Sequence, residues 1–204
     1  MRKRALEITL ESVAPHPTPA ASAEQYATPA RIAADVLWFA YAQGDIAGRS
    51  IADLGCGTGI FAIGAALLGA RRALGVDADS VAIRVARQNA RTLAARARFR
   101  VQDVRDYRGA VDTVVMNPPF GAQRRHADLP FLEAAVRAAP VVYSFHNATT
   151  ESFIVRKLRS LGAEPTHRKS YAFPIPHAFP FHREARREIP IVLFRAERRS
   201  PRKV

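Results

Sequence analysis

The chain is poor in several residue types, and each shortage excludes a class of protein. It has one cysteine among 204 residues, so no internal disulfide can form and no cysteine cluster can bind a metal ion. No apolar run approaches the ~18 residues that a transmembrane helix needs. The N-terminus starts Met1-Arg2-Lys3-Arg4 and lacks the apolar core of a signal peptide. We therefore expect a cytoplasmic protein with no membrane contact and no metal site.

Acidic residues are also scarce relative to basic ones. The 18 Asp and Glu residues face 31 Lys and Arg residues, giving a formal net charge of +13. Such a charge attracts polyanions, although an arginine excess is also what a GC-rich genome produces. The length fits one domain. We expect an N-terminal extension over 1–22, a single domain over 23–197 and a basic tail over 198–204.

Apolar segments of strand and helix length alternate through the middle of the chain. We expect strands near 50–54, 72–76, 98–102, 111–116 and 141–146, and helices over 30–43, 58–68, 79–94, 131–138 and 149–161. Repeated strand–helix units predict a parallel sheet in an α/β fold. Two more strands are expected within 165–197, and Pro190 marks an edge or a strand start there. Thr28 and Pro29 read as the N-cap and first turn of the 30–43 helix.

A glycine-rich turn lies between the first of these strands and its helix. It reads Asp53-Leu54-Gly55-Cys56-Gly57-Thr58-Gly59, in the context that a nucleotide-binding loop needs. The spacing is D-x-G-x-G-x-G and differs from the dinucleotide form. Cys56 is read as a small packing residue within the turn.

Two further strands end in acidic residues. Asp77 follows the second strand, 24 positions after Asp53, where an acid typically bonds ribose hydroxyls. Gln102 and Asp103 follow the third strand. A strand-terminal Asp can instead cap the next helix, and either Asp77 or Asp79 could cap the one beginning near Val81.

The most informative four residues are Asn117-Pro118-Pro119-Phe120, directly after an apolar strand. The two prolines end strand pairing and stiffen the turn. The Asn117 amide oxygen and the Pro118 carbonyl are then two converging acceptors, which suit an exocyclic amino group. Phe120 offers a flat surface on which an extruded base can stack.

Together these motifs resemble Rossmann-like methyltransferases that use S-adenosylmethionine. The chain is similar to the methyltransferase-like family whose eukaryotic member methylates N6 of one adenosine in small-subunit ribosomal RNA. The likeness includes Tyr143-Ser144-Phe145-His146 and Phe181-His182, and it implies a central seven-stranded, mostly parallel sheet with helices on both faces. It places Asn117, Pro118, Pro119 and Phe120 around the target base. The implied S-adenosylmethionine site comprises Gln25, Tyr26, Thr28, Asp53, Gly55, Gly57, Thr58, Gly59, Ile60, Asp77, Gln102 and Asp103.

The resemblance also suggests macromolecular partners. A basic segment after Phe120 and an aromatic, basic segment near 171–187 suit unpaired RNA, although the second could equally pack on the sheet edge. The RNA-contact candidates are Arg124, Arg125, Phe181, His182, Arg183, Arg186 and Arg187. Family members work with a small zinc-binding activator protein, which we expect at an open sheet edge near 98–102. His146 and His182 are expected to be structural or RNA-contacting and not catalytic.

Three other functions fit parts of the pattern. The Asn-Pro-Pro turn can also hold a side-chain amide, as in N5-glutamine methylation of a translation release factor, but Tyr is usual where Phe120 stands. DNA adenine methylation is another possible function, but the sequence shows no evident separate target-recognition domain. A catalytically silent RNA-binding assembly factor is opposed by the intact glycine turn, acids and Asn117.

Overall fold

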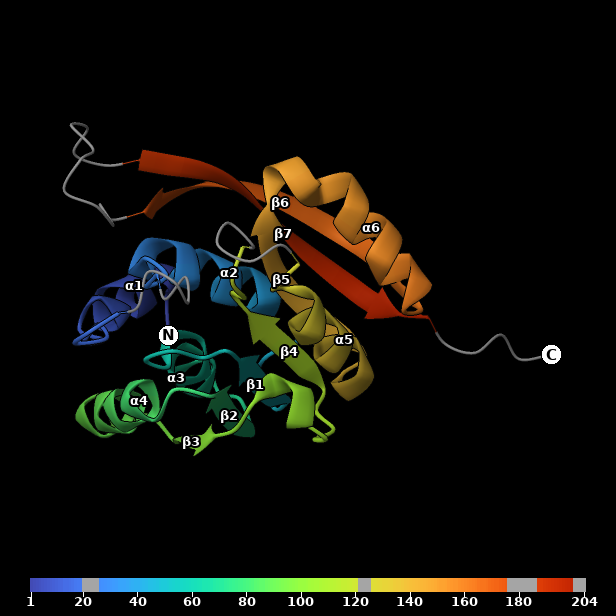
Figure 1. Ribbon diagram of the computed structural model, residues 1–204. Helices are drawn as coiled ribbons and strands as arrows, with labels where there is room; N and C mark the ends of the chain where they lie inside the picture. Colours follow the sequence, from blue (N-terminus) through green and yellow to red (C-terminus); the bar gives the residue numbers. More distant parts are fainter. Residues whose placement is uncertain (20–25, 121–125, 176–186, 200–204) are drawn as a thin grey trace.

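The computed structural model describes residues 1–19, 26–120, 126–175 and 187–199. Seven strands form one sheet in the order β3-β2-β1-β4-β5-β7-β6 (Figure 1). The strands are β1 (Ser50–Leu54), β2 (Arg72–Asp77), β3 (Ala97–Val101), β4 (Thr113–Met116), β5 (Val141–Asn147), β6 (Ala163–Ile175) and β7 (Arg187–Arg198). The helices are α1 (Lys3–Glu11), α2 (Ala30–Ala42), α3 (Ile60–Leu67), α4 (Ser80–Thr92), α5 (Leu129–Ala138) and α6 (Glu151–Ser160).

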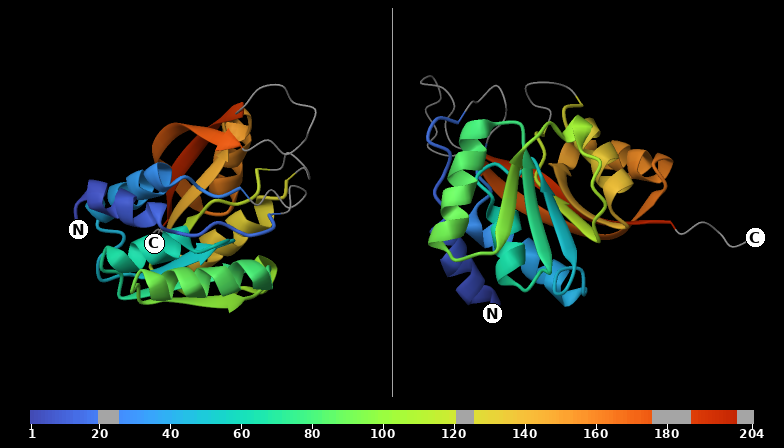
Figure 2. Two further views of the ribbon diagram at one scale, coloured as in Figure 1. Left: turned by 90° about the vertical axis from the view of Figure 1, so that its left-hand side faces the viewer. Right: turned by 90° about the horizontal axis from the view of Figure 1, so that it is seen from below.

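The sheet is parallel from β3 to β5, and β7 and β6 run antiparallel at the other side. Helices α1 to α4 pack on one face and α5 and α6 on the other, so the core has two layers of buried side chains (Figure 2). This arrangement confirms the predicted α/β fold with its seven-stranded, mostly parallel sheet. Among the described residues, no helix is both long and apolar enough to cross a membrane.

The last strand in sequence, β7, lies inside the sheet between β5 and β6. Pro190 is tolerated near its start because pairing with β5 extends only to Ile191. At Pro190 itself the partner is Ala172 of β6, so the strand has one neighbour there.

The N-terminal segment, which the sequence sets apart as an extension, begins with a helix that belongs to the core. Leu6 and Leu10, one turn apart on α1, are 0% and 1% exposed and pack with α2 and α3. Lys3 forms an ion pair with Asp35 of α2, which Lys169 of β6 also reaches. Burying two leucine side chains contributes about 3–6 kcal/mol, so α1 is a structural part of the domain.

The α2 N-terminus differs from the expected cap. Its N-cap residue is Pro29, with no side-chain cap hydrogen bond, and the hydroxyl of Thr28 accepts a bond from Asn117 instead. Thr28 is therefore not the helix cap.

Candidate active site

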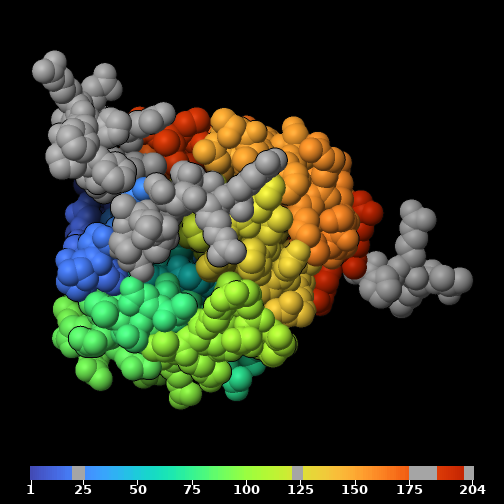
Figure 3. All heavy atoms as spheres, in the orientation of Figure 1, coloured from blue at the N-terminus to red at the C-terminus, as the bar shows by residue number. Residues whose placement is uncertain are grey.

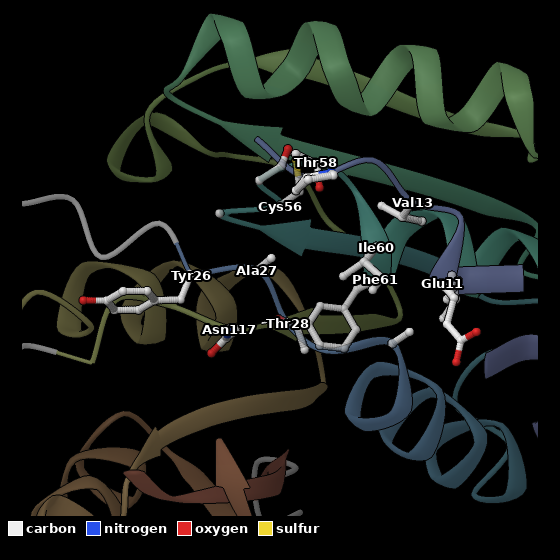
Figure 4. A pocket seen from close by; sticks show the side chains of 15 residues that line it. Glu11, Val13, Tyr26, Ala27, Thr28, Cys56, Thr58, Ile60, Phe61 and Asn117 are labelled. Carbon is white, nitrogen blue, oxygen red and sulfur yellow. Dashed lines mark hydrogen bonds between the residues drawn. The ribbon is translucent and has the colours of Figure 1, made fainter. Parts of the chain in front are cut away.

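The predicted site residues converge where strand order reverses. Strand β1 leads through the glycine turn into α3 on one face, and its neighbour β4 leads towards α5 on the other. Ligands of open α/β sheets bind at the carboxyl ends of the strands at such a switch point. A cavity of about 320 Å³ opens here, bordered by the glycine turn, the segment before α2 and Asn117 (Figure 4). In the space-filling view α1 (blue) and α4 (green) lie next to each other on the face shown (Figure 3).

The glycine turn depends on glycine for conformation and for space. Gly55 and Gly59 have φ angles of 72° and 92°, which side-chain-bearing residues adopt at a cost. A Cβ on Gly59 would meet the Phe99 ring at 2.7 Å, and one on Gly55 would meet Phe131 at 2.8 Å. The turn is therefore packed closely against Phe99 of β3 and Phe131 of α5, and its Gly55 and Gly57 border the cavity.

Asp77 holds the shape of this turn. Its Oδ2 accepts from the Gly57 N–H at 2.8 Å and its Oδ1 from the Asp79 N–H at 2.9 Å. Burial raises the pKa of Asp77, and these backbone donors oppose that effect. The helix cap is Asp79, which accepts from the N–H groups of Val81 and Ala82. Asp77 is thereby released from capping and stands at the strand end.

Asp53 lies beneath the turn and does not line the cavity. It is 1% exposed, its Oδ2 accepts from the Ala62 N–H at 3.1 Å, and its Oδ1 has no hydrogen-bond partner in the part of the chain that the structure describes. Burial raises the pKa of Asp53 to about 8, so the carboxyl group is mostly protonated at neutral pH. Its place fits a support for the start of α3.

Cys56 is buried and lines the cavity. Burial, with the carboxyl groups of Asp53 and Asp77 nearby, raises the pKa of its thiol well above the usual value. A thiol held protonated is a poor nucleophile, which agrees with the packing role expected from the sequence.

Asn117 has its amide oriented by a neighbour. Its Nδ2 donates to the Thr28 hydroxyl at 3.0 Å, and its buried Oδ1 has no hydrogen-bond partner among the described residues. Buried acceptors without partners are rare in proteins. The amide oxygen is therefore available to a ligand donor beside the cavity.

Phe120 is braced from the adjoining layer. Its ring meets the fully buried Phe173 edge-on, with centroids 5.5 Å apart. Phe173 lies in β6, within the aromatic segment for which the sequence allows either RNA contact or packing on the sheet edge. Phe173 itself is a packing residue. Pro118 is buried and Pro119 is half-buried, so the turn is tightly enclosed.

The third strand end carries Gln102 and Asp103. The Gln102 Nε2 donates to the Asp106 carbonyl, and the buried Oε1 of Gln102 accepts no hydrogen bond from any described residue. Asp103 forms a two-point pair with Arg105, which lowers the pKa of the Asp103 carboxyl to about 2. These residues do not border the cavity in this structure.

The remaining predicted residues divide into two groups. Tyr26, Thr28, Gly55, Gly57, Thr58 and Ile60 border the cavity, whereas Gly59 packs against Phe99 and, like Asp77, does not border it. Outside the described residues lie Gln25, Arg124, Arg125, Phe181, His182, Arg183 and Arg186, and Arg187 is the first residue of β7.

His146 is 1% exposed and engaged on both ring nitrogens. Its Nδ1 lies 2.9 Å from Asp128 and its Nε2 lies 2.8 Å from the Ser144 hydroxyl. All three side chains are buried, so this constellation is structural, as the sequence suggested for His146.

Sequence reasoning missed the N-terminal wall of the cavity. Leu10, Glu11, Val13 and Pro15 border it, from α1 and the segment that follows (Figure 4). Leu6 and Leu10, four residues apart, were the one available signal that α1 buries a face.

The site fits S-adenosylmethionine on the structure's own terms. Its glycine turn allows close approach, its walls mix apolar and polar groups, and an unpaired amide oxygen stands beside it. The family model of ribosomal protein L11 methyltransferase (PrmA) matches residues 36–118, which span the glycine turn, Asp77 and Asn117. At 18% identity, the fold matches a Synechocystis magnesium protoporphyrin IX methyltransferase with bound S-adenosylmethionine, with a TM-score of 0.65 over 82% of this chain and 78% of that one.

Several similar proteins match over nearly the whole chain. An uncharacterized protein of Methanocaldococcus jannaschii is 39% identical, covering 97% of this chain and 95% of its own length. The rRNA N(6)-adenosine-methyltransferase Mettl5 of Drosophila melanogaster is 33% identical, covering 97% of both chains. The structure of a protein from Pyrococcus horikoshii, assigned as an RNA methyltransferase, has a TM-score of 0.90 at 39% identity over 97% of this chain and 98% of that one. The chain is a methyltransferase with S-adenosylmethionine as its cofactor, and it belongs to the Mettl5 family of rRNA N6-adenosine methyltransferases.

Proposed function

We propose that this protein transfers the methyl group of S-adenosylmethionine to N6 of an adenosine in small-subunit ribosomal RNA. The observation that carries the proposal is the buried Oδ1 of Asn117, which has no hydrogen-bond partner among the described residues. Thr28 orients the Asn117 amide, and Asn117 begins the turn after β4 that ends in Phe120. The full-length similarity to rRNA N6-adenosine methyltransferases supports the same reaction.

The chain's own residues orient the acceptor. As N6 bonded to the methyl group, the bond from that group to sulfur would break and S-adenosylhomocysteine would leave, and the proton lost from N6 would pass to solvent. An adenine amino group is a weak nucleophile because its lone pair is delocalised into the ring. Hydrogen bonds from that group to Asn117 Oδ1 and the Pro118 carbonyl localise the lone pair towards the cofactor's reactive methyl group. They also hold the near-attack geometry. Phe120, braced by Phe173, provides the stacking surface for a base taken out of the RNA.

The bound cofactor supplies an electrophilic methyl group on a positively charged sulfur. Gly55 and Gly57 let the backbone approach it closely, and Asp77, which shapes this turn, stands where ribose hydroxyls are expected. Tyr26 and Ile60 line the cavity walls. The remaining cofactor contacts expected from the resemblance, Gln25, Gln102 and Asp103, belong to this proposal.

Protein methylation is the competing function, because of the match to the ribosomal protein L11 methyltransferase model. That match ends at residue 118 and leaves out Phe120 and all later strands. An L11 methyltransferase of Edwardsiella ictaluri covers 42% of this chain and 30% of its own length. The shared part holds the glycine turn and reaches Asn117 and Pro118, but it leaves out the stacking surface proposed at Phe120.

Acceptor choice can be tested by fractionation. Intact small ribosomal subunits would be incubated with the protein and S-adenosylmethionine labelled in the methyl group, then separated into RNA and protein. We expect the label in the RNA. Label in ribosomal protein with none in RNA would contradict the proposal and favour the glutamine or L11-type reaction.

We further propose that a small zinc-binding activator adds to the β3 edge of the sheet. The two outer strands differ in how they are protected. β6 carries Pro165 and Pro174, a bulge after Pro165 and exposed Arg168, all of which discourage strand pairing. β3 contains no proline, and its Val101 is 47% exposed. Strand addition therefore favours β3.

The β3 ladder shows which groups a partner would use. The Gln102 N–H donates to Asp77 O of β2, so the alternation of a strand directs the Val101 N–H away from the sheet. Arg87 Nη2 donates to the Phe99 carbonyl on that same open side. A partner strand replaces this arginine contact, and exposed Arg98 and Arg100 favour one that carries carboxylates.

Val101→Pro removes the outward N–H of residue 101 and leaves the pairing of β3 with β2 in place. Val101→Thr keeps both the N–H and the pairing. Each variant would be co-expressed with the zinc-binding partner and recovered by affinity purification. We expect loss of the partner with proline and retention with threonine. Equal recovery with both variants would place the partner elsewhere.

A further inference from the structure

The segment after α1 crosses the cofactor cavity without regular structure of its own. Residues 12–19, here called the N-terminal strap, are mostly exposed, yet Val13 and Pro15 border the cavity. Figure 4 shows Val13 opposite Ile60 and Phe61 of α3. An irregular exposed segment keeps a defined place only where its backbone is tied to something rigid.

The first tie is the side chain of Asn89 on α4. Its Oδ1 accepts from the Ala14 N–H at 3.0 Å, and its Nδ2 donates to the Ala14 carbonyl at 3.1 Å. The same Nδ2 donates to the Thr58 carbonyl at 3.0 Å. One carboxamide therefore joins the strap directly to the glycine turn.

Asn89 is unusual where it stands. Asparagine is a weak helix former, and this one is inside α4 and 3% exposed. A buried amide is tolerated when its donors and acceptor are paired, and the three side-chain hydrogen bonds of Asn89 described above go to the strap and the turn. Packing alone would be served by an apolar residue, so the contacts account for the asparagine.

The second tie runs through His16. Its Nδ1 accepts from the Thr18 N–H at 3.1 Å, so Nε2 carries the proton and donates to Asp79 Oδ2, also at 3.1 Å. Asp79 in turn donates its N–H to Asp77. Both ties thus end on residues that shape the cofactor site.

We propose that the N-terminal strap is a functional wall of the S-adenosylmethionine site and that Asn89 is its positioning residue. Asn89 acts through the strap and the glycine turn and touches no reacting atom. The inference rests on the cofactor assignment and is independent of the RNA substrate proposed above.

The test compares Asn89→Ala with Gln88→Ala, which removes a neighbouring carboxamide on the exposed side of the same helix. Affinity for S-adenosylhomocysteine would be measured by calorimetry, beside the thermal midpoint. Losing the Asn89 bonds raises Kd about tenfold if the net loss is near that of one strong hydrogen bond. Gln88→Ala leaves Kd unchanged. In turnover, Asn89→Ala raises KM for the cofactor and keeps kcat.

A lower thermal midpoint with an unchanged Kd would overturn the proposal, since it would make Asn89 merely structural. A second test, amide hydrogen exchange, uses the unaltered protein and so does not depend on whether a variant folds. Saturating S-adenosylhomocysteine is expected to slow exchange of amides in 12–19, the Ala14 N–H above all. Unchanged exchange there, with slowed exchange in the glycine turn, would equally overturn it.

Discussion

Removing the Thr28 hydroxyl separates two roles that one residue could have. Thr28 borders the cofactor cavity and also accepts the hydrogen bond from Asn117 Nδ2 at 3.0 Å. Thr28→Val keeps the side chain's shape, and at 9% exposure little water can replace the lost acceptor. The Asn117 amide then loses its orientation, and its oxygen no longer points reliably at the incoming amino group.

The magnitude follows from that single bond. A net hydrogen bond contributes ~1 kcal/mol, and leaving a buried partner unpaired costs ~1–3 kcal/mol. Expressed in the transition state, this lowers kcat by about 5- to 150-fold. The cofactor Kd changes little, because the glycine turn and Asp77 are untouched.

The assay is steady-state methyl transfer to RNA at saturating cofactor, with calorimetry for cofactor affinity. Thr28→Ser is the matched control, since it restores the acceptor and is expected to recover most of kcat. A Thr28→Val protein with unchanged kcat and weakened cofactor binding would refute the reasoning and make Thr28 a cofactor contact only.

Three further predictions concern the turn, its support and the stacking surface. Asp53→Asn removes a carboxyl group whose pKa is higher in the folded than in the unfolded protein, so its stabilising contribution is complete below the unfolded-state pKa and is lost as pH rises from there through about 8. Within that pH range the free energy of unfolding of the variant, measured by urea denaturation, is expected to gain on that of the unaltered protein by up to about 1.4 kcal/mol per pH unit. Parallel pH profiles of the two proteins would contradict this. Gly59→Ala combines a φ of 92° with a 2.7 Å approach to Phe99, and we expect it to destabilise the fold by about 3 kcal/mol or more. Gly57→Ala has open space around its Cβ and is expected to cost only the ~1–2 kcal/mol of backbone strain. An equal loss of stability in both variants would show that the contact with Phe99 does not matter. Phe120→Leu is expected to raise KM for RNA by about 5- to 150-fold through lost base stacking, with Phe120→Tyr near normal, and an unaffected KM would exclude Phe120 as the stacking surface.

Most of the layered fold can be predicted from the sequence because the features that determine it depend on residues close together in the chain. Strand–turn–helix order, the glycine turn and the stop at Pro118 each depend on neighbouring residues. The position of β3 at the sheet edge also follows from the strand order usual for this fold, and the structure confirms it.

The parts that escaped prediction depend on contacts between distant residues. Ala14 and Asn89 are 75 positions apart, and Thr28 and Asn117 are 89 apart, so no periodicity links them. Phe173 sits in a segment whose aromatic and basic composition fits either RNA contact or packing. Only the β6–β7 pairing settles that its ring is buried.

In the proposed reaction, Asn117 presents its amide oxygen to the N6 amino group of an adenosine. The most direct test is mass spectrometry of nucleosides from small-subunit ribosomal RNA treated with the protein and isotopically labelled S-adenosylmethionine. Asn117→Ala, checked for cofactor binding, serves as the paired sample. We expect labelled N6-methyladenosine with the unaltered protein and none with Asn117→Ala. Label on another base or position, or equal N6-methyladenosine from both proteins, would contradict it.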